Sequence, residues 1–199
     1  MILNMEPIMS NLAYKMDDLF TYADYLCWET EERYEIIDGI AYAMASPTMR
    51  HQIISWELTG IIYDCLKDKP CRAFTAPFDV RLFPEEDDSD TTVVQPDLLV
   101  VCDKSKLADG KACKGAPDLI IEILSPSSVI MDRKVKAEKY REAGVKEYWI
   151  VNSETLDIMV NRLTDGRYVS IVYKDNVEST VLPGLTVNLN SLRANVQKP

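Results

Sequence analysis

Two almost continuously apolar runs, each containing an acidic residue, most constrain what this chain can fold into. They span Thr92 to Cys102 and Asp118 to Ser125. Such runs are typical of β-strands that are covered on both faces, as in the sheet of an α/β protein. Glu122 lies in the middle of the second run, among aliphatic residues. Keeping a carboxylate charged there costs several kcal/mol unless it has a partner, so the sequence predicts a specific role for Glu122.

The other acidic residue, Asp97, follows Pro96. Because proline is confined to strand starts and edges, we expect Asp97 near one end of its strand. If the two strands pair, the carboxylates of Asp97 and Glu122 can converge on a hard cation such as Mg²⁺, with the carbonyl of Ile123 as a further ligand and waters completing the octahedron. Two plainer interpretations stay open, namely a buried salt bridge for Glu122 and a strand-end turn for Asp97.

The rest of the chain predicts one α/β domain over residues 1–199. Helices are expected from Asp17 or Asp18 to about Trp28, from Thr48 to about Lys67, and from about Ile130 to Ala143 before Gly144. Further strands are expected over Cys71 to Phe83, Glu147 to Asn152 and, at an edge, Val177 to Leu182. Asp38-Gly39 and Asp165-Gly166 predict the turns of two hairpins, Tyr34 to Ala45 and Leu156 to Leu163 with Arg167 to Tyr173. From Thr48 to Asn152 the order is helix, strand, strand, strand, helix, strand.

The last of these helices carries Asp132, Lys136 and Tyr140 at a spacing of i, i+4 and i+8, which places them on one face. That face can point toward the sheet, or Asp132 and Lys136 can form an ordinary surface pair. The same segment holds several basic residues in an acidic protein: Arg133, Lys134, Lys139, Arg141 and Lys146. They can meet a phosphate backbone or form a solvated helix face, and both interpretations stay open.

Two further residues are candidates for acid-base chemistry. His51 is the only histidine and lies one turn into the expected Thr48 helix. Its imidazole titrates near neutral pH, although a lone histidine is more often structural. Glu35 lies among apolar neighbours in the first hairpin and can act as a general base or contact a metal-bound water. A single histidine excludes a His-rich metal site within one chain.

Charge and composition limit the classes of function. The net charge of −10 weighs against a protein that coats nucleic acid non-specifically, but it allows a nuclease with a locally basic surface. The acidic run from Glu85 to Asp90 is expected to be a solvated loop, because it lacks the ligand spacing and the central glycine of a calcium loop. No apolar stretch is long enough to predict a membrane span, and the first residues do not form a secretory signal.

Several other classes lack their residues. The five cysteines are odd in number and include no CxxC pair, which favours a reduced, cytoplasmic compartment and argues against a zinc knuckle. There is no GxSxG motif and no P-loop. Two carboxylates can in principle serve a glycosidase, but nothing in the sequence points to the aromatic platforms and the larger cleft that such enzymes use.

The motifs also occur together in a recognisable order. They are Tyr34-Glu35-Ile36-Ile37-Asp38-Gly39, Ser46-Pro47-Thr48 with His51, Pro96-Asp97, Pro117-Asp118-Leu119 with Glu122-Ile123-Leu124-Ser125-Pro126-Ser127, Asp132 with Lys136 and Tyr140, and Gly144-Val145 with Glu147-Tyr148-Trp149. Over roughly residues 17 to 185 the chain therefore resembles the bacterial family called putative restriction endonucleases. That family is abundant in cyanobacteria and is a branch of the PD-(D/E)XK nuclease superfamily.

The resemblance implies a restriction-endonuclease-like core with the same order of helices and strands. It also implies that Asp97 and Glu122 bind Mg²⁺ or Mn²⁺, that the substrate is nucleic acid, most simply DNA, and that the chain forms a homodimer. The superfamily places a lysine two residues after the glutamate, where this chain has Leu124. The family supplies the lysine from the following helix, and Lys136 matches it, with a role in orienting or deprotonating the attacking water or in stabilising the transition state. Glu35 and His51 match recurrent polar positions.

Two functions follow as hypotheses. The first is a Mg²⁺- or Mn²⁺-dependent endonuclease that uses Asp97, Glu122 and Lys136. The second is a binding or regulatory module that keeps the nuclease scaffold without turnover. The net charge of −10 and the apolar Leu124 motivate the second hypothesis. Fold analogy alone does not decide between them.

Overall fold

The computed structural model describes residues 19–125 and 131–197. Its strands are β1 Tyr34–Ile37, β2 Ile40–Ala43, β3 Arg72–Thr75, β4 Val80–Arg81, β5 Val93–Val94, β6 Leu98–Val101, β7 Cys113–Lys114, β8 Leu119–Leu124, β9 Glu147–Asn152, β10 Ile158–Thr164, β11 Arg167–Tyr173, β12 Asn176–Glu178 and β13 Thr186–Asn188. Its helices are α1 Tyr22–Tyr25, α2 Met49–Leu66, the 3₁₀ turn η1 Lys104–Leu107, the π-helical segment η2 Met131–Lys136, α3 Ala137–Ala143 and α4 Leu189–Val196.

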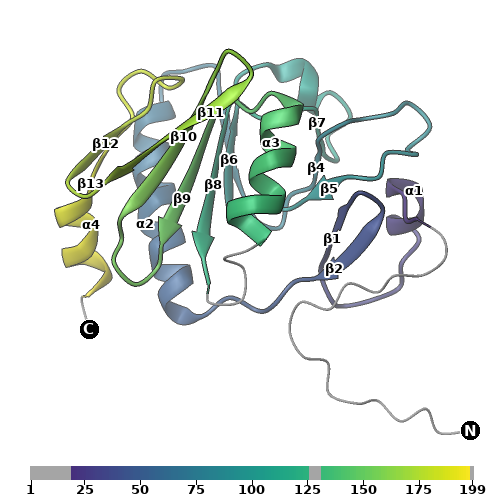
Figure 1. Cartoon of the computed structure of the whole chain (residues 1–199), viewed down its shortest axis with the longest axis horizontal. Helices are drawn as coiled ribbons and strands as arrows, with labels where there is room; N and C mark the ends of the chain where they lie inside the picture. The colour runs from purple at the N-terminus through teal and green to yellow at the C-terminus, as the bar shows by residue number, and fades with distance from the viewer. Residues whose placement is uncertain (1–18, 126–130, 198–199) are drawn as a thin grey trace, which may run out of the picture.

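The strands form two main sheets (Figure 1). The larger has six strands in the order β11-β10-β9-β8-β6-β3, and the smaller has five in the order β2-β1-β5-β4-β7. In the larger sheet β6 and β8 are antiparallel, whereas β8 and β9 are parallel and joined through η2 and α3. Within this sheet the order α2, β3, β6, β8, α3, β9 is the predicted one, so the α/β fold class and the core order are confirmed.

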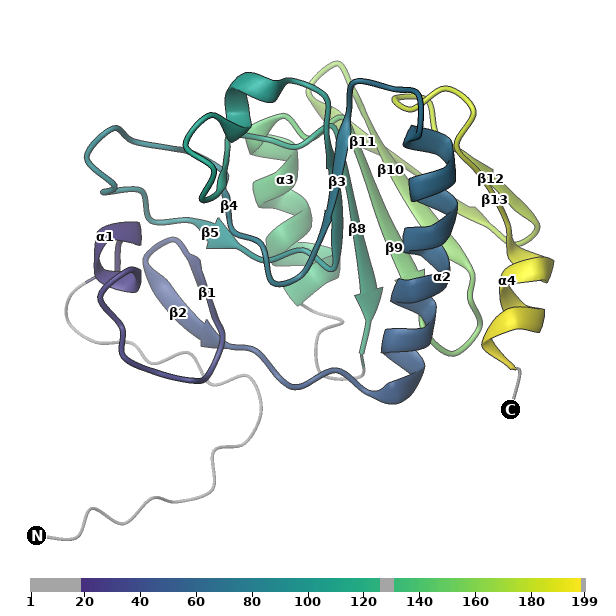
Figure 2. The same cartoon turned by 180° about the vertical axis from the view of Figure 1, so that it is seen from behind.

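Helices cover both faces of the larger sheet (Figure 2). On one face α2 presents Ile54, Leu58 and Ile62 to a core that includes Trp149 of β9, and α4 packs beside it. On the other face α3 places Tyr140 against Tyr148. Every residue of β8 is buried, as expected for a central strand with helices on both sides.

Local signals set the turns and helix ends as predicted. Asp38 and Gly39 both have positive φ, 51° and 76°, which is the type I′ geometry that joins two strands tightly. Asp165 and Gly166 form the same turn between β10 and β11. Thr48 caps α2, its hydroxyl accepting a hydrogen bond from the backbone N–H of His51 at 3.2 Å.

Two expected strands are each divided in the structure. The segment Cys71 to Phe83 contains β3 and β4, and the segment Thr92 to Cys102 contains β5 and β6. Pro77 and Pro96 lie at the breaks, where a residue without a backbone N–H cannot continue a ladder. Because β4 and β5 join the smaller sheet, the chain crosses between the two sheets at residues 95–97.

Other expected elements differ in extent or in pairing, or lie outside the described residues. The first helix covers only Tyr22–Tyr25, because Thr21 and Asp24 form a capping box there. The expected starts of this helix, Asp17 or Asp18, and of the third helix, Ile130, lie outside the described residues, as do Pro126 and Ser127. Of the expected edge strand Val177 to Leu182, only Val177 and Glu178 lie in a strand, β12, which pairs with β13 in a separate ribbon instead of the larger sheet.

Two expectations drawn from composition need correction. The acidic run is not wholly solvated, because Asp90 is buried and accepts hydrogen bonds from the guanidinium of Arg81. Two cysteines are not reduced, since Cys71 and Cys102 form a disulfide with an S–S distance of 2.04 Å. These cysteines adjoin a pair of opposite residues in β3 and β6, which brings them side by side. No helix in residues 19–125 and 131–197 is long and apolar enough to cross a membrane.

Candidate functional site

The pairing of β6 with β8 brings the two predicted acids together. Leu98 lies opposite Ile121, which sets the preceding Asp97 beside Glu122. The backbone N–H of Asp97 donates to Glu122 Oε2 at 3.2 Å. The backbone N–H of Ile123 donates to Asp97 Oδ2 at 2.8 Å. Each strand therefore holds the carboxylate of the other in place. The backbone carbonyl of Ile123, the residue after Glu122, lies at the same end of β8.

Lys136 lies at the centre of a buried ionic cluster. Its ammonium is 2.8 Å from Glu35 Oε1, 3.0 Å from Glu122 Oε1 and 3.5 Å from Asp132 Oδ1. The side chains of all four residues are only 5–6% exposed. The surface-pair interpretation of Asp132 and Lys136 is therefore wrong, whereas a buried salt bridge to Glu122 does form. The face of the helix that bears them points into the protein.

The helix that delivers Lys136 starts as a π-helical segment, η2, and continues as α3. π-Helical turns are rare and are frequently found at functional sites. Tyr140, on the following turn, is also buried, and its hydroxyl donates to Glu122 Oε1 at 2.8 Å. The i, i+4, i+8 spacing of Asp132, Lys136 and Tyr140 predicted that they share a face, but it indicated no chemical role for Asp132 or Tyr140.

Glu35 connects the cluster to the smaller sheet. It lies on β1 and is buried. Its Oε1 atom accepts from Lys136 and also from the backbone N–H of Gln95, at 2.9 Å. Gln95 follows β5 directly, so Glu35 holds the segment that leads to Asp97.

His51 reaches the same site from the first turn of α2. Its Nε2 atom is 3.0 Å from Asp97 Oδ2. Burial lowers the pKa of His51, but its hydrogen bond to Asp97 and the charges of Asp97 and Asp132 outweigh this and raise the pKa above its ordinary value. Its Nδ1 atom is buried and has no hydrogen-bond partner among the described residues.

The site carries an excess of negative charge. Four carboxylates, those of Glu35, Asp97, Glu122 and Asp132, surround one lysine and one histidine. Burial raises the pKa of Glu122 well above its usual range, Lys136 opposes this rise, and the charges of Asp132, Asp97 and Glu35 add to it. Burial lowers the pKa of Lys136, but the surrounding carboxylates raise it well above its usual value. Such a site favours a further cation.

The donor atoms suit a hard cation. Carboxylate and carbonyl oxygens are the ligands that Mg²⁺ prefers, and this ion usually retains several waters. Within residues 19–125 and 131–197, no three side chains of His, Cys, Asp or Glu form a complete metal cage. Asp97 and Glu122 supply two carboxylates at one strand end, next to the carbonyl of Ile123, and Mg²⁺ is commonly held by one or two carboxylates with several waters.

The basic residues of the neighbouring helix divide into two groups. Lys139, Arg141 and Lys146 form ion pairs with carboxylates. Arg133 and Lys134 are exposed and have no ion-pair partner among the described residues. Of these five basic residues, Arg133 and Lys134 are therefore the ones whose charge no carboxylate of the described residues neutralises.

Comparisons with known proteins place the chain among nuclease-like proteins. A family model described as "Putative restriction endonuclease" matches residues 22–194. An uncharacterised protein from Synechocystis is 27% identical over 157 residues, which is 76% of this chain and 78% of that protein. The crystal structure of a putative nuclease from Anabaena variabilis superposes with a TM-score of 0.72 and 21% identity, covering 89% of this chain and 99% of the other. At this identity the superposition shows a shared fold.

Proposed function

Since the chain belongs to the family of putative restriction endonucleases, we propose that it is an endonuclease that hydrolyses phosphodiester bonds of nucleic acid, most simply DNA, with Mg²⁺ or Mn²⁺. The observation that carries the proposal is the excess of carboxylates around Lys136 at one end of β6 and β8. Two adjoining acids with a buried lysine suit phosphodiester hydrolysis, in which negative charge accumulates on the phosphate.

The ion would be held by Asp97, Glu122 and the carbonyl of Ile123. When bound, Mg²⁺ or Mn²⁺ supplies charge neutralisation at the scissile phosphate and lowers the pKa of the attacking water. His51 would act as a positioning residue, because its Nε2 atom hydrogen bonds Asp97 Oδ2 and fixes the orientation of that carboxylate.

Lys136 would act as a charged donor. Because its pKa lies well above the usual value, it keeps its proton at neutral pH and does not serve as a general base. Its ammonium can instead orient the attacking water and stabilise charge on the phosphoryl oxygens. Glu35, which accepts a hydrogen bond from Lys136, would set the position of that ammonium.

The proposal is tested by incubating mixed DNA and RNA substrates with Mg²⁺ and with Mn²⁺. Wild type is compared with Glu122→Gln and with Glu142→Gln, an exposed acid on α3 that serves as the matched control. We expect Glu122→Gln to lose at least about 100-fold in rate, as on removal of a principal charge-stabilising group, and the control to stay within about twofold. Undiminished cleavage by Glu122→Gln would refute the site.

The same experiment separates the alternative function. Leu124 stands where the wider superfamily has its lysine, which favours a module that binds without turnover. Such a module would bind DNA or a protein partner equally well with and without metal, and Lys136→Ala would leave its affinity unchanged. Metal-dependent cleavage by wild type that is lost in Glu122→Gln would exclude it.

We also propose a homodimer. On α2 the side chains of Met49, Trp56 and Tyr63, spaced by seven residues, are 79%, 77% and 64% exposed. Two helical turns separate successive members, so they form one stripe on the face away from the sheet. Exposed apolar stripes of this kind support self-association through a second copy of the same helix.

A further inference from the structure

The residue before His51 on α2 carries a positive charge at the edge of the proposed site. Arg50 is half-buried, and its Nε and Nη2 atoms donate to the backbone carbonyls of Ser153 at 2.6 Å and Glu154 at 3.1 Å. These two carbonyls belong to the turn between β9 and β10. Because the guanidinium is held at two of its three nitrogens, it has little freedom left to lose when a ligand binds.

The charge of Arg50 is not neutralised by these contacts. Backbone carbonyls carry no net charge, and Arg50 forms no ion pair with a carboxylate within residues 19–125 and 131–197. Its third nitrogen, Nη1, makes no hydrogen bond with the described residues. The buried atoms without a partner there are His51 Nδ1, Gln95 Oε1 and Trp149 Nε1, so Nη1 is open to a ligand. A fixed guanidinium with free N–H groups is suited to hold a phosphate.

Arg50 lies at the same end of the larger sheet as the proposed catalytic acids. Its contact Ser153 follows Asn152, which is opposite Leu124 in the parallel pair of β8 and β9. Glu122 is two residues before Leu124. With strands about 4.8 Å apart and a rise of about 3.3 Å per residue, the carbonyl of Ser153 lies within roughly 15 Å of the Cα atom of Glu122. Figure 2 shows the first turn of α2 and the end of β8 at this end of the molecule.

Positive charge on the other face of the sheet lies on η2. Arg133 and Lys134 are exposed there without an ion-pair partner among the described residues. Since α2 covers one face of the larger sheet and η2 with α3 the other, the sheet lies between Arg50 and these two residues (Figure 2). A nucleic-acid strand that crosses this end of the sheet would meet positive charge on both sides of Asp97 and Glu122.

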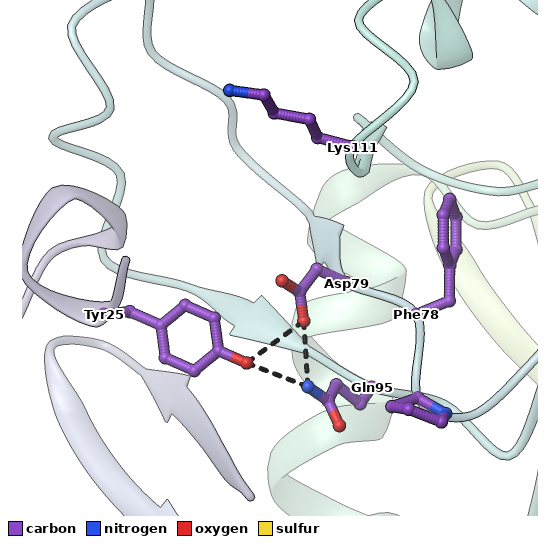
Figure 3. Close-up of a pocket in the computed structure, with 6 residues that line it drawn as sticks. Tyr25, Phe78, Asp79, Gln95 and Lys111 are labelled. Atoms are coloured by element: carbon purple, nitrogen blue, oxygen red, sulfur yellow. Dashed lines mark hydrogen bonds between the residues drawn. The ribbon is translucent and has the colours of Figure 1, made fainter. Parts of the chain in front are cut away.

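The surface beside the smaller sheet offers no such charge. A pocket of about 260 Å³ lies there, lined by Tyr25, Pro77, Phe78, Asp79, Gln95 and Lys111 (Figure 3). Asp79 accepts hydrogen bonds from Tyr25 and Gln95 and forms no ion pair within the described part of the chain. Its carboxylate offsets the ammonium of Lys111, so the pocket has no net positive charge with which to hold a phosphate. The end of the larger sheet is therefore the better path for a strand.

We propose that Arg50 binds a backbone phosphate of the nucleic acid, a few nucleotides from the bond to be cut. Each strand of a duplex carries one phosphate per about 3.4 Å of helix axis, so the distance from Glu122 corresponds to a few nucleotides. The contact is made to the backbone, so Arg50 sets the position of the strand and confers no base preference. This inference rests on the proposed nuclease function and assigns that function a substrate-binding residue.

The first test measures binding without metal or cleavage. A fluorescently labelled DNA is titrated in chelator, over a salt series, with wild type, Arg50→Gln and Arg50→Lys. Loss of one phosphate contact should weaken binding by Arg50→Gln about tenfold and reduce the slope of log K against log salt by about 1. Arg50→Lys should keep the slope, because it keeps the charge.

Arg72→Gln is the matched control, because it removes the same charge elsewhere. Arg72 is exposed and has no ion-pair partner among the described residues. It lies opposite Val101, at the end of β6 away from Asp97. Its affinity should stay within about twofold of wild type, with the same slope, since only a charge in contact with a phosphate releases a counterion.

The second test locates the phosphate. End-labelled DNAs, each with one phosphate replaced by a neutral methylphosphonate, are cleaved with Mg²⁺ or Mn²⁺. Wild type should lose cleavage at bonds a fixed few nucleotides to one side of the replaced phosphate. Arg50→Gln should lack this protection, because its contact is already gone, whereas Arg72→Gln should keep it. A role confined to fixing the turn between β9 and β10 would leave the protection unchanged in Arg50→Gln.

The outcomes separate this inference from the proposed function. An unchanged slope in Arg50→Gln, or wild-type cleavage that methylphosphonates outside the cut bond do not affect, would overturn the phosphate contact and leave metal-dependent cleavage untouched. A reduced slope for Arg50→Gln in a protein that cleaves no nucleic acid would support the contact and refute the nuclease. The wild-type cleavage pattern needs no variant, so a misfolded Arg50→Gln protein would not rescue the inference.

Discussion

At the scale of single residues, Lys136 explains how so many acids share one buried site. Its ammonium contacts three carboxylates that come from β1, β8 and η2. A buried charge is tolerated only when it is paired and hydrogen bonded. The charges of the cluster therefore depend on one another. Removing one carboxylate should raise the free energy of unfolding near neutral pH, whereas removing the lysine should lower it.

Glu122→Gln tests the excess of negative charge. The pKa of Glu122 is raised in the folded protein, so the folded state binds this proton more tightly than the unfolded state. Wild-type stability therefore decreases as pH rises above the ordinary carboxyl range. In chelator, the unfolding free energy of the variant minus that of wild type should increase by about 1–2 kcal/mol from pH 4 to pH 8. Urea unfolding at both pH values measures it, and an unchanged or opposite difference would contradict the raised pKa.

Lys136→Met tests the other sign. With the cation removed, the buried carboxylates of Glu35, Glu122 and Asp132 lose the positive charge that neutralises them, which should cost about 3–5 kcal/mol at pH 7. The cost should be smaller at pH 4, because Glu122 takes up a proton readily. Denaturant unfolding at both pH values measures the loss, with Lys136→Arg as the control that keeps the charge. A loss below about 1 kcal/mol at pH 7 would show that the lysine is not the counterion of these acids.

At the scale of elements, the parallel pair β8 and β9 forms the rigid part of the site. Both strands are buried almost throughout, and they carry Glu122 and Trp149 respectively. Their apolar composition was sufficient to predict two central strands, because only helices on both faces can cover such runs. The site therefore rests on two strands that are covered on both faces at the centre of the larger sheet.

Trp149→Ala should destabilise the protein by about 3–5 kcal/mol, because the ring is fully buried between β9 and α2 and its loss leaves a cavity. Val172→Ala, at a 56% exposed position on the edge strand β11, should stay within about 0.5 kcal/mol. Chemical denaturation of both variants provides the measurement. Comparable losses in the two proteins would argue against the predicted core.

The exposed part of η2 gives a separate prediction about binding. Arg133→Ala combined with Lys134→Ala should weaken DNA binding and reduce the slope of log K against log salt by roughly 2, one for each phosphate that is no longer neutralised. Arg141→Ala serves as the control, because its guanidinium is held by Glu138 and by the carbonyl of Gly166. Fluorescence anisotropy over a salt series distinguishes them. Equal slopes in all three proteins would exclude phosphate binding by η2.

At the scale of the whole molecule, the sequence predicted the larger sheet better than the smaller one. Long apolar runs and the two Asp-Gly turns have strong local causes. The divisions at Pro77 and Pro96 were missed because an apolar run does not reveal that its two halves belong to different sheets. Asp97 and Glu122 could be proposed from charge in an apolar setting, whereas Gln95 could not, because a neutral amide next to a strand carries no comparable signal.

The proposed assembly is tested at this scale too. Trp56→Lys places a charge in the middle of the exposed stripe on α2 and should convert a dimer into a monomer. Light scattering after gel filtration should give twice the mass of one chain for wild type and one chain mass for the variant. Val172→Lys, at an exposed apolar position on β11, should remain dimeric. A monomeric wild type would exclude the homodimer.

Two backbone hydrogen bonds join Asp97 to the strand that bears Glu122, so the proposed site forms only when β6 and β8 pair in the correct register. In a sheet, a slip of one residue turns every side chain of a strand to the opposite face. A chain that folded with β8 out of register would thus point Glu122 away from Asp97 and from Lys136. Under the proposed function, such a molecule would not cleave nucleic acid, so the register of one strand pair decides whether a folded chain is active.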